Sequence, residues 1–137
     1  MVKKIKYIFL IFFLFGAFSA TLKSQDIQAI AVIVNDEVIS RYDVNQRVRL
    51  ILVTSGIPAT EENIKRIEEQ AIKALIDEKI QIQEAIKLEV PDSPNEINLM
   101  LDNIARSNQT TAEGILESIT SQGVNSETLL NQIKSEL

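Results

Sequence analysis

The long segment from Thr60 to Leu88 constrains the fold of this chain more than any other part of its sequence. Its apolar residues recur at 3.6-residue spacing along one face, which predicts a single long amphipathic helix. A second apolar face follows over the C-terminal half, and coverage this wide predicts that other helices enclose that half. The two faces are formed by Ile64, Ile67, Ala71, Leu75, Ile82 and Ile86, and by Ile72, Ile76 and Ile80.

The residues before this helix predict a small β-hairpin that leads into a shorter helix. Two runs of β-branched residues within Ile30–Ile39 flank the turn-forming sequence Asn35-Asp36-Glu37. Ser40 has the character of a helix N-cap, and the acid at Asp43 completes a capping pattern for a helix through about Thr54. Because an isolated two-stranded hairpin is marginally stable in water, we expect it to pack against a helix.

Three shorter helices are predicted after Pro91. Each begins at a cap residue, and the first of them also has a proline at its first helical position. No repeat of 20 to 50 residues interrupts this pattern. The fold class predicted is therefore mainly α: a compact multi-helix domain of about five helices with one small N-terminal β-hairpin. The start signals are Ser93-Pro94 with Glu96, then Thr110 or Thr111, then Asn125 or Ser126.

The N-terminus has the pattern of a secretory signal peptide. Three lysines precede the apolar run Tyr7–Phe18, and small residues then predict cleavage between Ser19 and Ala20. The run has 12 residues, whereas a helix needs about 20 to cross a bilayer. We therefore expect a signal peptide over residues 1–19, a short linker over 20–27 and one domain over 28–137. An uncleaved signal-anchor, with Lys23 at the outer interface, is the alternative.

Charge and composition narrow the compartment and the partners. Three of the 14 basic residues lie in the leader, so residues 20–137 keep 11 basic against 19 acidic residues, a net charge of about −8. A small domain this acidic is not expected to bind nucleic acid or an anionic membrane surface. The chain contains no cysteine, so its fold depends on apolar packing alone. We expect a soluble periplasmic or secreted protein.

The sequence offers little chemistry for catalysis. It contains no histidine and no cysteine, which excludes imidazole bases, thiolate nucleophiles and the usual zinc ligands. The acidic pairs Glu61-Glu62 and Glu68-Glu69 are interpreted as solvated faces of a helix, and Asp36-Glu37 as part of a turn. We expect no cofactor, no metal site and no enzymatic activity in this chain.

Apolar residues on the last three helices are the candidates for binding. Short, moderately amphipathic helices bury such residues in a core, or present them as a groove for apolar segments of another chain. Both interpretations remain open for each position. The candidate groove residues are Met100, Ile115, Leu116, Ile119, Leu129, Leu130 and Ile133.

Several segments, in order, resemble the N-terminal domain of SurA-type periplasmic chaperones. Ala31–Val44 resembles the family's strand, Asn-containing turn, second strand and acid-capped helix, and Ala74–Ala85 its long central helix. The resemblance covers roughly residues 28–137. It depends on the order of these segments along the chain, together with the signal-peptide pattern at the N-terminus. Related exported isomerases, including the membrane-anchored PpiD and the Gram-positive PrsA groups, begin similarly. Further matching positions are Glu96-Ile97, Ile104-Ala105, Asn108, Gly123-Val124, Leu129 and Ile133.

The resemblance implies a periplasmic chaperone that holds unfolded or nascent outer-membrane proteins soluble without ATP. It also implies that a helix from the far end of a longer chain completes this domain, so that such a helix or a second subunit would close the groove. Two alternatives remain. One is a parvulin-type peptidyl-prolyl isomerase whose catalytic domains lie outside this chain. In the family the parvulin site relies on histidines, and this chain has none. The other is a signal-anchored structural or interaction domain.

Overall fold

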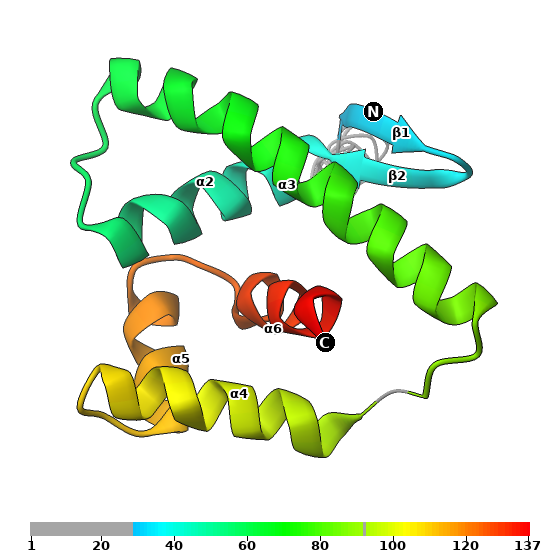
Figure 1. Ribbon diagram of the computed structural model, residues 1–137. Coiled ribbons are helices and arrows are strands. Elements are labelled where there is room, and N and C mark those ends of the chain that lie inside the picture. Colours follow the sequence, from blue (N-terminus) through cyan, green and yellow to red (C-terminus); the bar gives the residue numbers. More distant parts are fainter. Residues whose placement is uncertain (1–28, 92) are drawn as a thin grey trace, which may run out of the picture.

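The computed structural model describes residues 29–91 and 93–137, which form two strands and five helices (Figure 1). The predicted signal peptide and its cleavage site lie outside the described residues. The mainly helical fold with one N-terminal hairpin is confirmed. The elements are β1 (Ile30–Val34), β2 (Glu37–Ser40), α2 (Arg41–Ser55), α3 (Glu61–Lys87), α4 (Pro94–Ser107), α5 (Ala112–Ser121) and α6 (Ser126–Glu136).

The hairpin forms because β-branched residues flank a two-residue turn. β1 and β2 are antiparallel, with Val34 opposite Glu37 and Ile33 opposite Val38. Asn35 takes the left-handed conformation at φ 55°, which asparagine tolerates better than most residues. The pairing is irregular between Ile30 and Val32. The predicted turn at Asn35-Asp36 is therefore confirmed, while Glu37 begins the second strand.

Local capping sets both ends of α2. The Ser40 side chain accepts a hydrogen bond from the Asp43 backbone N–H, and the Asp43 carboxylate accepts one from the Ser40 N–H at 2.8 Å. This reciprocal capping box confirms the predicted start, and satisfies backbone donors that have no partner within the helix. Gly56 ends the helix in the left-handed conformation at φ 63°, where glycine meets no steric penalty.

The later helices begin as predicted, with one difference in detail. Thr60, Thr111 and Asn125 each accept a hydrogen bond from the first turn of the helix that follows. Ser93 precedes α4 but makes no side-chain cap bond, so the capping box expected with Glu96 is not formed. Pro94 at the first helical position supplies the start instead, because its fixed φ suits a helix and it has no N–H to satisfy.

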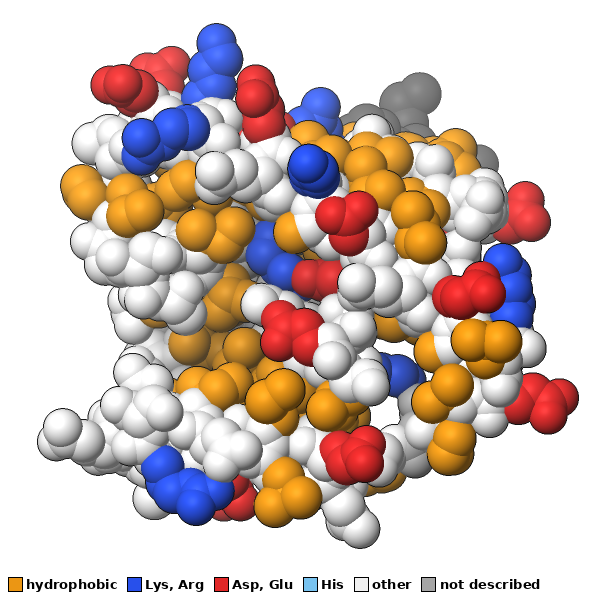
Figure 2. Space-filling model, viewed as in Figure 1, with side chains coloured by type: hydrophobic (Ala, Val, Ile, Leu, Met, Phe, Trp, Pro, Cys, Tyr) orange, Lys and Arg blue, Asp and Glu red, His pale blue; other side chains and the backbone are white. Residues whose placement is uncertain are grey.

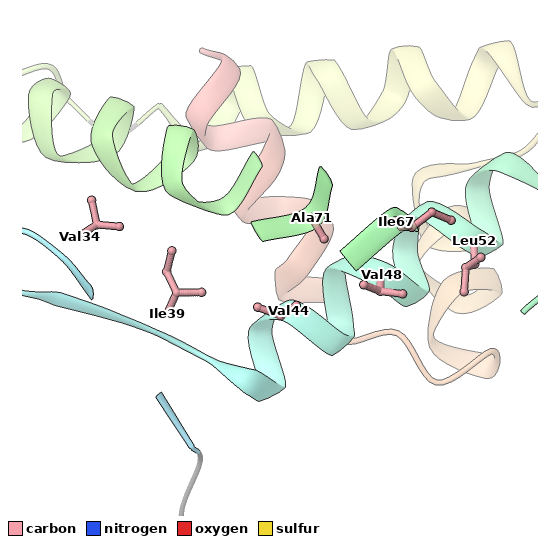
Figure 3. Close-up of a cluster of buried hydrophobic side chains, with 7 residues drawn as sticks. All are labelled: Val34, Ile39, Val44, Val48, Leu52, Ile67 and Ala71. Carbon is pink, nitrogen blue, oxygen red and sulfur yellow. The ribbon is translucent and has the colours of Figure 1, made fainter. Parts of the chain in front are cut away.

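The first hydrophobic core joins the hairpin to α2 and the N-terminal half of α3. Figure 3 shows its seven buried residues converging from these elements. Ile39 from β2 and Ile67 from α3 are among the most buried side chains of the described chain. This contact supplies the helical support that the hairpin needs. The cluster consists of Val34, Ile39, Val44, Val48, Leu52, Ile67 and Ala71.

The second core lies on the opposite side of α2. Leu50 of α2 packs there with buried residues of α4, α5 and α6, whereas Val48 and Leu52 face the first core. α2 is therefore covered on two sides and serves both cores. α6 lies between α3 and α4 (Figure 1). The buried members of this cluster are Leu50, Leu101, Ile119, Val124, Leu129 and Ile133.

The C-terminal half of α3 is less covered than its sequence predicts. Ile80 keeps 49% of its surface exposed and Ile86 keeps 67%. The expectation that other helices enclose this half is therefore wrong within the described residues. α6 packs on part of it, and a cleft remains between α3, the link to α4 and α6. No helix within residues 29–91 and 93–137 has the length and apolar character needed to cross a membrane.

Candidate functional site

A large cleft lies at the C-terminal end of α3. Its walls come from the last turns of α3, the link to α4, the first turn of α4 and the last turn of α6, and its volume is about 710 Å³. Figure 2 shows hydrophobic side chains gathered at this end of α3 and along the link, beside a hollow. Apolar residues dominate the lining; they include Ile82, Ile86, Leu88, Val90, Ile97 and Leu137. We refer to this region as the α3–α4 cleft.

Three neighbouring side chains make the α3–α4 cleft unusual for a protein surface. Ile86, Leu88 and Val90 expose 67%, 68% and 55% of their surface. Single exposed apolar residues are common, but a contiguous set that lines one cleft indicates a binding surface.

The backbone at this end of α3 is held by a specific helix-ending motif. The Val90 N–H donates to the Ala85 carbonyl at 3.0 Å, and the Glu89 N–H donates to the Ile86 carbonyl at 3.1 Å. Glu89 itself takes the left-handed conformation at φ 54°. These two bonds define a Schellman motif, which turns the chain sharply out of the helix. The motif brings Leu88 and Val90 to the mouth of the cleft.

The smaller cleft lies between β2, α2, α3 and α6, and its volume is about 360 Å³. A buried ion pair forms part of its wall. Arg47, 3% exposed, makes a two-pronged contact with Glu78, with Nη2 to Oε2 at 2.8 Å, and its Nη2 also donates to the Thr128 carbonyl at 3.3 Å. Nε of Arg47 is buried without a hydrogen-bond partner. The guanidinium thus ties α2, α3 and α6 together.

A second polar contact ties the hairpin turn to α3. The Lys79 ammonium donates to the Glu37 carboxylate at 2.6 Å, and Gln83 donates to the same carboxylate and to the Val34 carbonyl. These hydrogen bonds, with the charge of Lys79, hold the pKa of Glu37 below its ordinary value of 4.5. The cluster orients the hairpin on α3.

The predicted groove residues do not line either cleft. Ile119, Leu129 and Ile133 are buried in the second core, at 4%, 8% and 2% exposure. They stabilise the packing of α5 and α6, and little of their surface is open to another chain. The other four pack against the same core and stay partly exposed: Met100, Ile115, Leu116 and Leu130.

The residues of the α3–α4 cleft have a signal in the sequence that helical periodicity obscured. From Ile86 to Val90, apolar and charged residues alternate, which departs from the spacing of a helix face. Pro91 follows directly. Apolar residues that continue past the end of a periodic pattern, next to a helix stop, indicate side chains that are not buried when the helices pack.

The acidic pairs on α3 lie near the first turns of the helix and along its side. Glu61, Glu62 and Glu69 are solvent-exposed, and Glu68 makes an ion pair with Arg41 at 2.8 Å. Within residues 29–91 and 93–137, no three acidic side chains gather closely enough to hold a metal ion. The interpretation of these pairs as faces of a helix agrees with their exposure.

The fold and the cleft define a class of protein: a mainly helical domain with an N-terminal β-hairpin and an apolar cleft left open between its helices. The profile of the SurA N-terminal domain family matches residues 27–137. The chain therefore belongs to the SurA N-terminal domain family, which confirms the resemblance seen in the sequence.

Similar proteins occur in Vibrio and in Rickettsia. The chain is 29% identical over 123 residues to "Chaperone SurA" of Vibrio cholerae, covering 88% of this chain and 28% of that protein. It is 30% identical over 136 residues to an uncharacterised protein of Rickettsia conorii, covering 98% of this chain and 44% of that protein. The chain thus spans less than half the length of these relatives.

Proposed function

We propose that residues 28–137 form the client-binding domain of an exported, ATP-independent chaperone that holds unfolded outer-membrane proteins in the periplasm. The observation that carries this proposal is the open α3–α4 cleft, with Ile86, Leu88 and Val90 each more than half exposed. Membership of the SurA N-terminal domain family and the similarity to proteins named "Chaperone SurA" support it.

The size of the apolar surface argues for weak, reversible binding. Fully burying one Leu, Ile or Val side chain contributes about 1.5–3 kcal/mol, so burying the exposed parts of these three contributes roughly 3–6 kcal/mol. Association costs about 4–15 kcal/mol in lost freedom of the two partners. The cleft alone therefore cannot bind a client tightly, and a client must also contact other apolar surface. Weak contacts of this kind release a client when it folds, without ATP.

Further surface for a client is available on the last helices. Met100, Ile115, Leu116 and Leu130 are the predicted groove residues that stay partly exposed, and we propose them as secondary contacts. A C-terminal helix of a longer chain, or a second subunit, would cover the cleft when no client is bound. We further propose that these residues act by binding rather than catalysis, since the chain has no histidine or cysteine.

Light scattering of an aggregating client tests the proposal. A urea-unfolded outer-membrane protein is diluted with and without a several-fold molar excess of the purified protein. We expect suppressed aggregation, and reduced suppression by the variant Leu88→Ser/Val90→Ser. The matched control is Ile30→Ser/Ile33→Ser, which removes two similarly exposed residues, at 58% and 59%, from the hairpin. Absence of suppression by the wild type, or equal loss in both variants, would contradict the proposal.

A further inference from the structure

The charge at the rim of the α3–α4 cleft indicates which apolar segments it favours. Three carboxylates line the cleft, those of Glu84, Glu89 and Glu96, against one ammonium group, that of Lys134, among the described residues. Glu84 pairs with Lys87 at 3.2 Å at the exposed surface, whereas the ion pairs of the described chain do not include Glu89 or Glu96. Acidic side chains stand among hydrophobic ones on this side of the molecule (Figure 2).

The position of Glu89 is unfavourable for the stability of the fold. It follows the C-terminus of α3, where the carbonyl groups carry a partial negative charge that repels a carboxylate. It also takes the left-handed conformation at φ 54°, where glycine is the usual residue. Glu96, by contrast, lies in the first turn of α4, where the helix dipole favours an acid. The fold therefore accounts for Glu96 but not for Glu89.

The C-terminal end of α3 and the carboxylates both make the electrostatic potential at the cleft more negative. The negative end of the α3 dipole and the nearby carboxylates both place negative potential over an apolar surface. A client segment that is apolar and also carries Lys or Arg complements both the apolar surface and the negative potential. A second copy of this chain matches the negative potential less well, because the chain is acidic overall, with a net charge of −5.

We propose that the α3–α4 cleft selects apolar client segments flanked by lysine or arginine over equally apolar segments flanked by acids, and that Glu89 is a specificity-determining residue for this choice. This inference rests on the proposed function and specifies the chemistry of the client. Exposed ion pairs contribute about 0.2–1 kcal/mol each, so two such pairs give roughly a 2- to 30-fold preference at low salt.

Two fluorescent peptides test this selection against the purified protein. Both share one alternating apolar centre, and they carry either two Lys or two Glu residues at each end. We expect the Lys-flanked peptide to bind several-fold more tightly at low salt. The ratio of dissociation constants should approach one in about 1 M NaCl, where the Debye length falls to about 3 Å. Glu89→Gln should lower the ratio about 1.4- to 5-fold at low salt.

The matched control is Glu69→Gln, which makes the same change in net charge elsewhere on α3. Glu69 is exposed and lies roughly 20–30 Å from the carboxylates of α3's C-terminal end at 1.5 Å rise per residue, well beyond the Debye length of about 10 Å at 0.1 M salt. This control should leave the ratio unchanged. Glu89→Gly separates specificity from folding, because it should raise the unfolding midpoint by a few °C and still lower the ratio.

The possible outcomes distinguish the two proposals. If neither peptide binds the wild type, the proposed function fails, and the selection fails with it. If both peptides bind equally and the Glu89 variants change nothing, only the selection is overturned. A dimer in sedimentation that releases its interface when peptide binds, with no charge preference, would assign the cleft to a second copy and would also overturn the selection.

Discussion

The buried ion pair between Arg47 and Glu78 provides a quantitative test of how the helices are held together. The Arg47 side chain is 3% exposed and that of Glu78 is 13% exposed. Replacing Glu78 by leucine leaves the guanidinium buried with only the Thr128 carbonyl as an acceptor. Breaking a buried pair in this way costs about 3–5 kcal/mol, because an uncompensated charge stays in the interior.

That cost is large beside the total stability of such a domain. A domain of about 110 residues has an unfolding free energy of roughly 5–15 kcal/mol, and this one has no disulfide to add to it. We therefore expect Glu78→Leu to lower the thermal midpoint by about 12–20 °C, at about 4 °C per kcal/mol for this size. Urea denaturation followed by circular dichroism at 222 nm measures the change in free energy directly.

The double variant Arg47→Met/Glu78→Leu decides whether the uncompensated charge is the cause. An apolar pair of similar volume removes the charge as well as its partner, so most of the lost stability should return. A loss below about 1 kcal/mol in Glu78→Leu would refute the reasoning, and so would a double variant that is less stable than the single one.

Three further predictions concern the hairpin and the first core. Ile67→Ala should lower the unfolding free energy by about 2–5 kcal/mol, because Ile67 is 2% exposed and its loss leaves a cavity; urea denaturation measures it. Ser40→Ala should cost about 0.5–2 kcal/mol in the same assay, through loss of the capping box. Glu37→Gln should flatten the decline of stability as the pH falls below about 4.5, followed by urea denaturation at each pH. The pKa of Glu37 is lowered from 4.5 in the folded protein, so its contribution is present above that pH and is lost as the carboxylate is protonated.

Each of these three predictions has a matched control. Ile64→Ala removes a residue on the same helix that is 39% exposed, and an equal loss there would contradict the cavity argument. Ser40→Thr keeps the hydroxyl group, so a loss as large as that of Ser40→Ala would mean that the cap bond is not the cause. Lys79→Met removes the main cause of the lowered pKa of Glu37 and should flatten the same pH range; unchanged pH dependence in both variants would contradict the assignment.

The elements of this fold could be predicted because their signals are local. Asn35 in the turn, Ser40 with Asp43 at the start of α2 and Gly56 at its end each act on backbone groups within a few residues. The periodicity of α3 likewise predicts its length from neighbouring residues alone. Only the cap at Ser93 was predicted and not formed, since Pro94 starts that helix without it.

Which apolar faces are covered was decided by the tertiary structure. Ile119 and Ile133 have the same sequence character as Ile86, yet the first two are buried in the second core and Ile86 lies open at the cleft. Burial depends on which parts of α3 the other helices contact, which no local pattern encodes. The pairing of Arg47 with Glu78 is also a contact between separate helices. The sequence by itself thus determined the helices and the hairpin, through short-range hydrogen bonding and periodicity. The packing of those helices determined where the chain leaves apolar surface exposed.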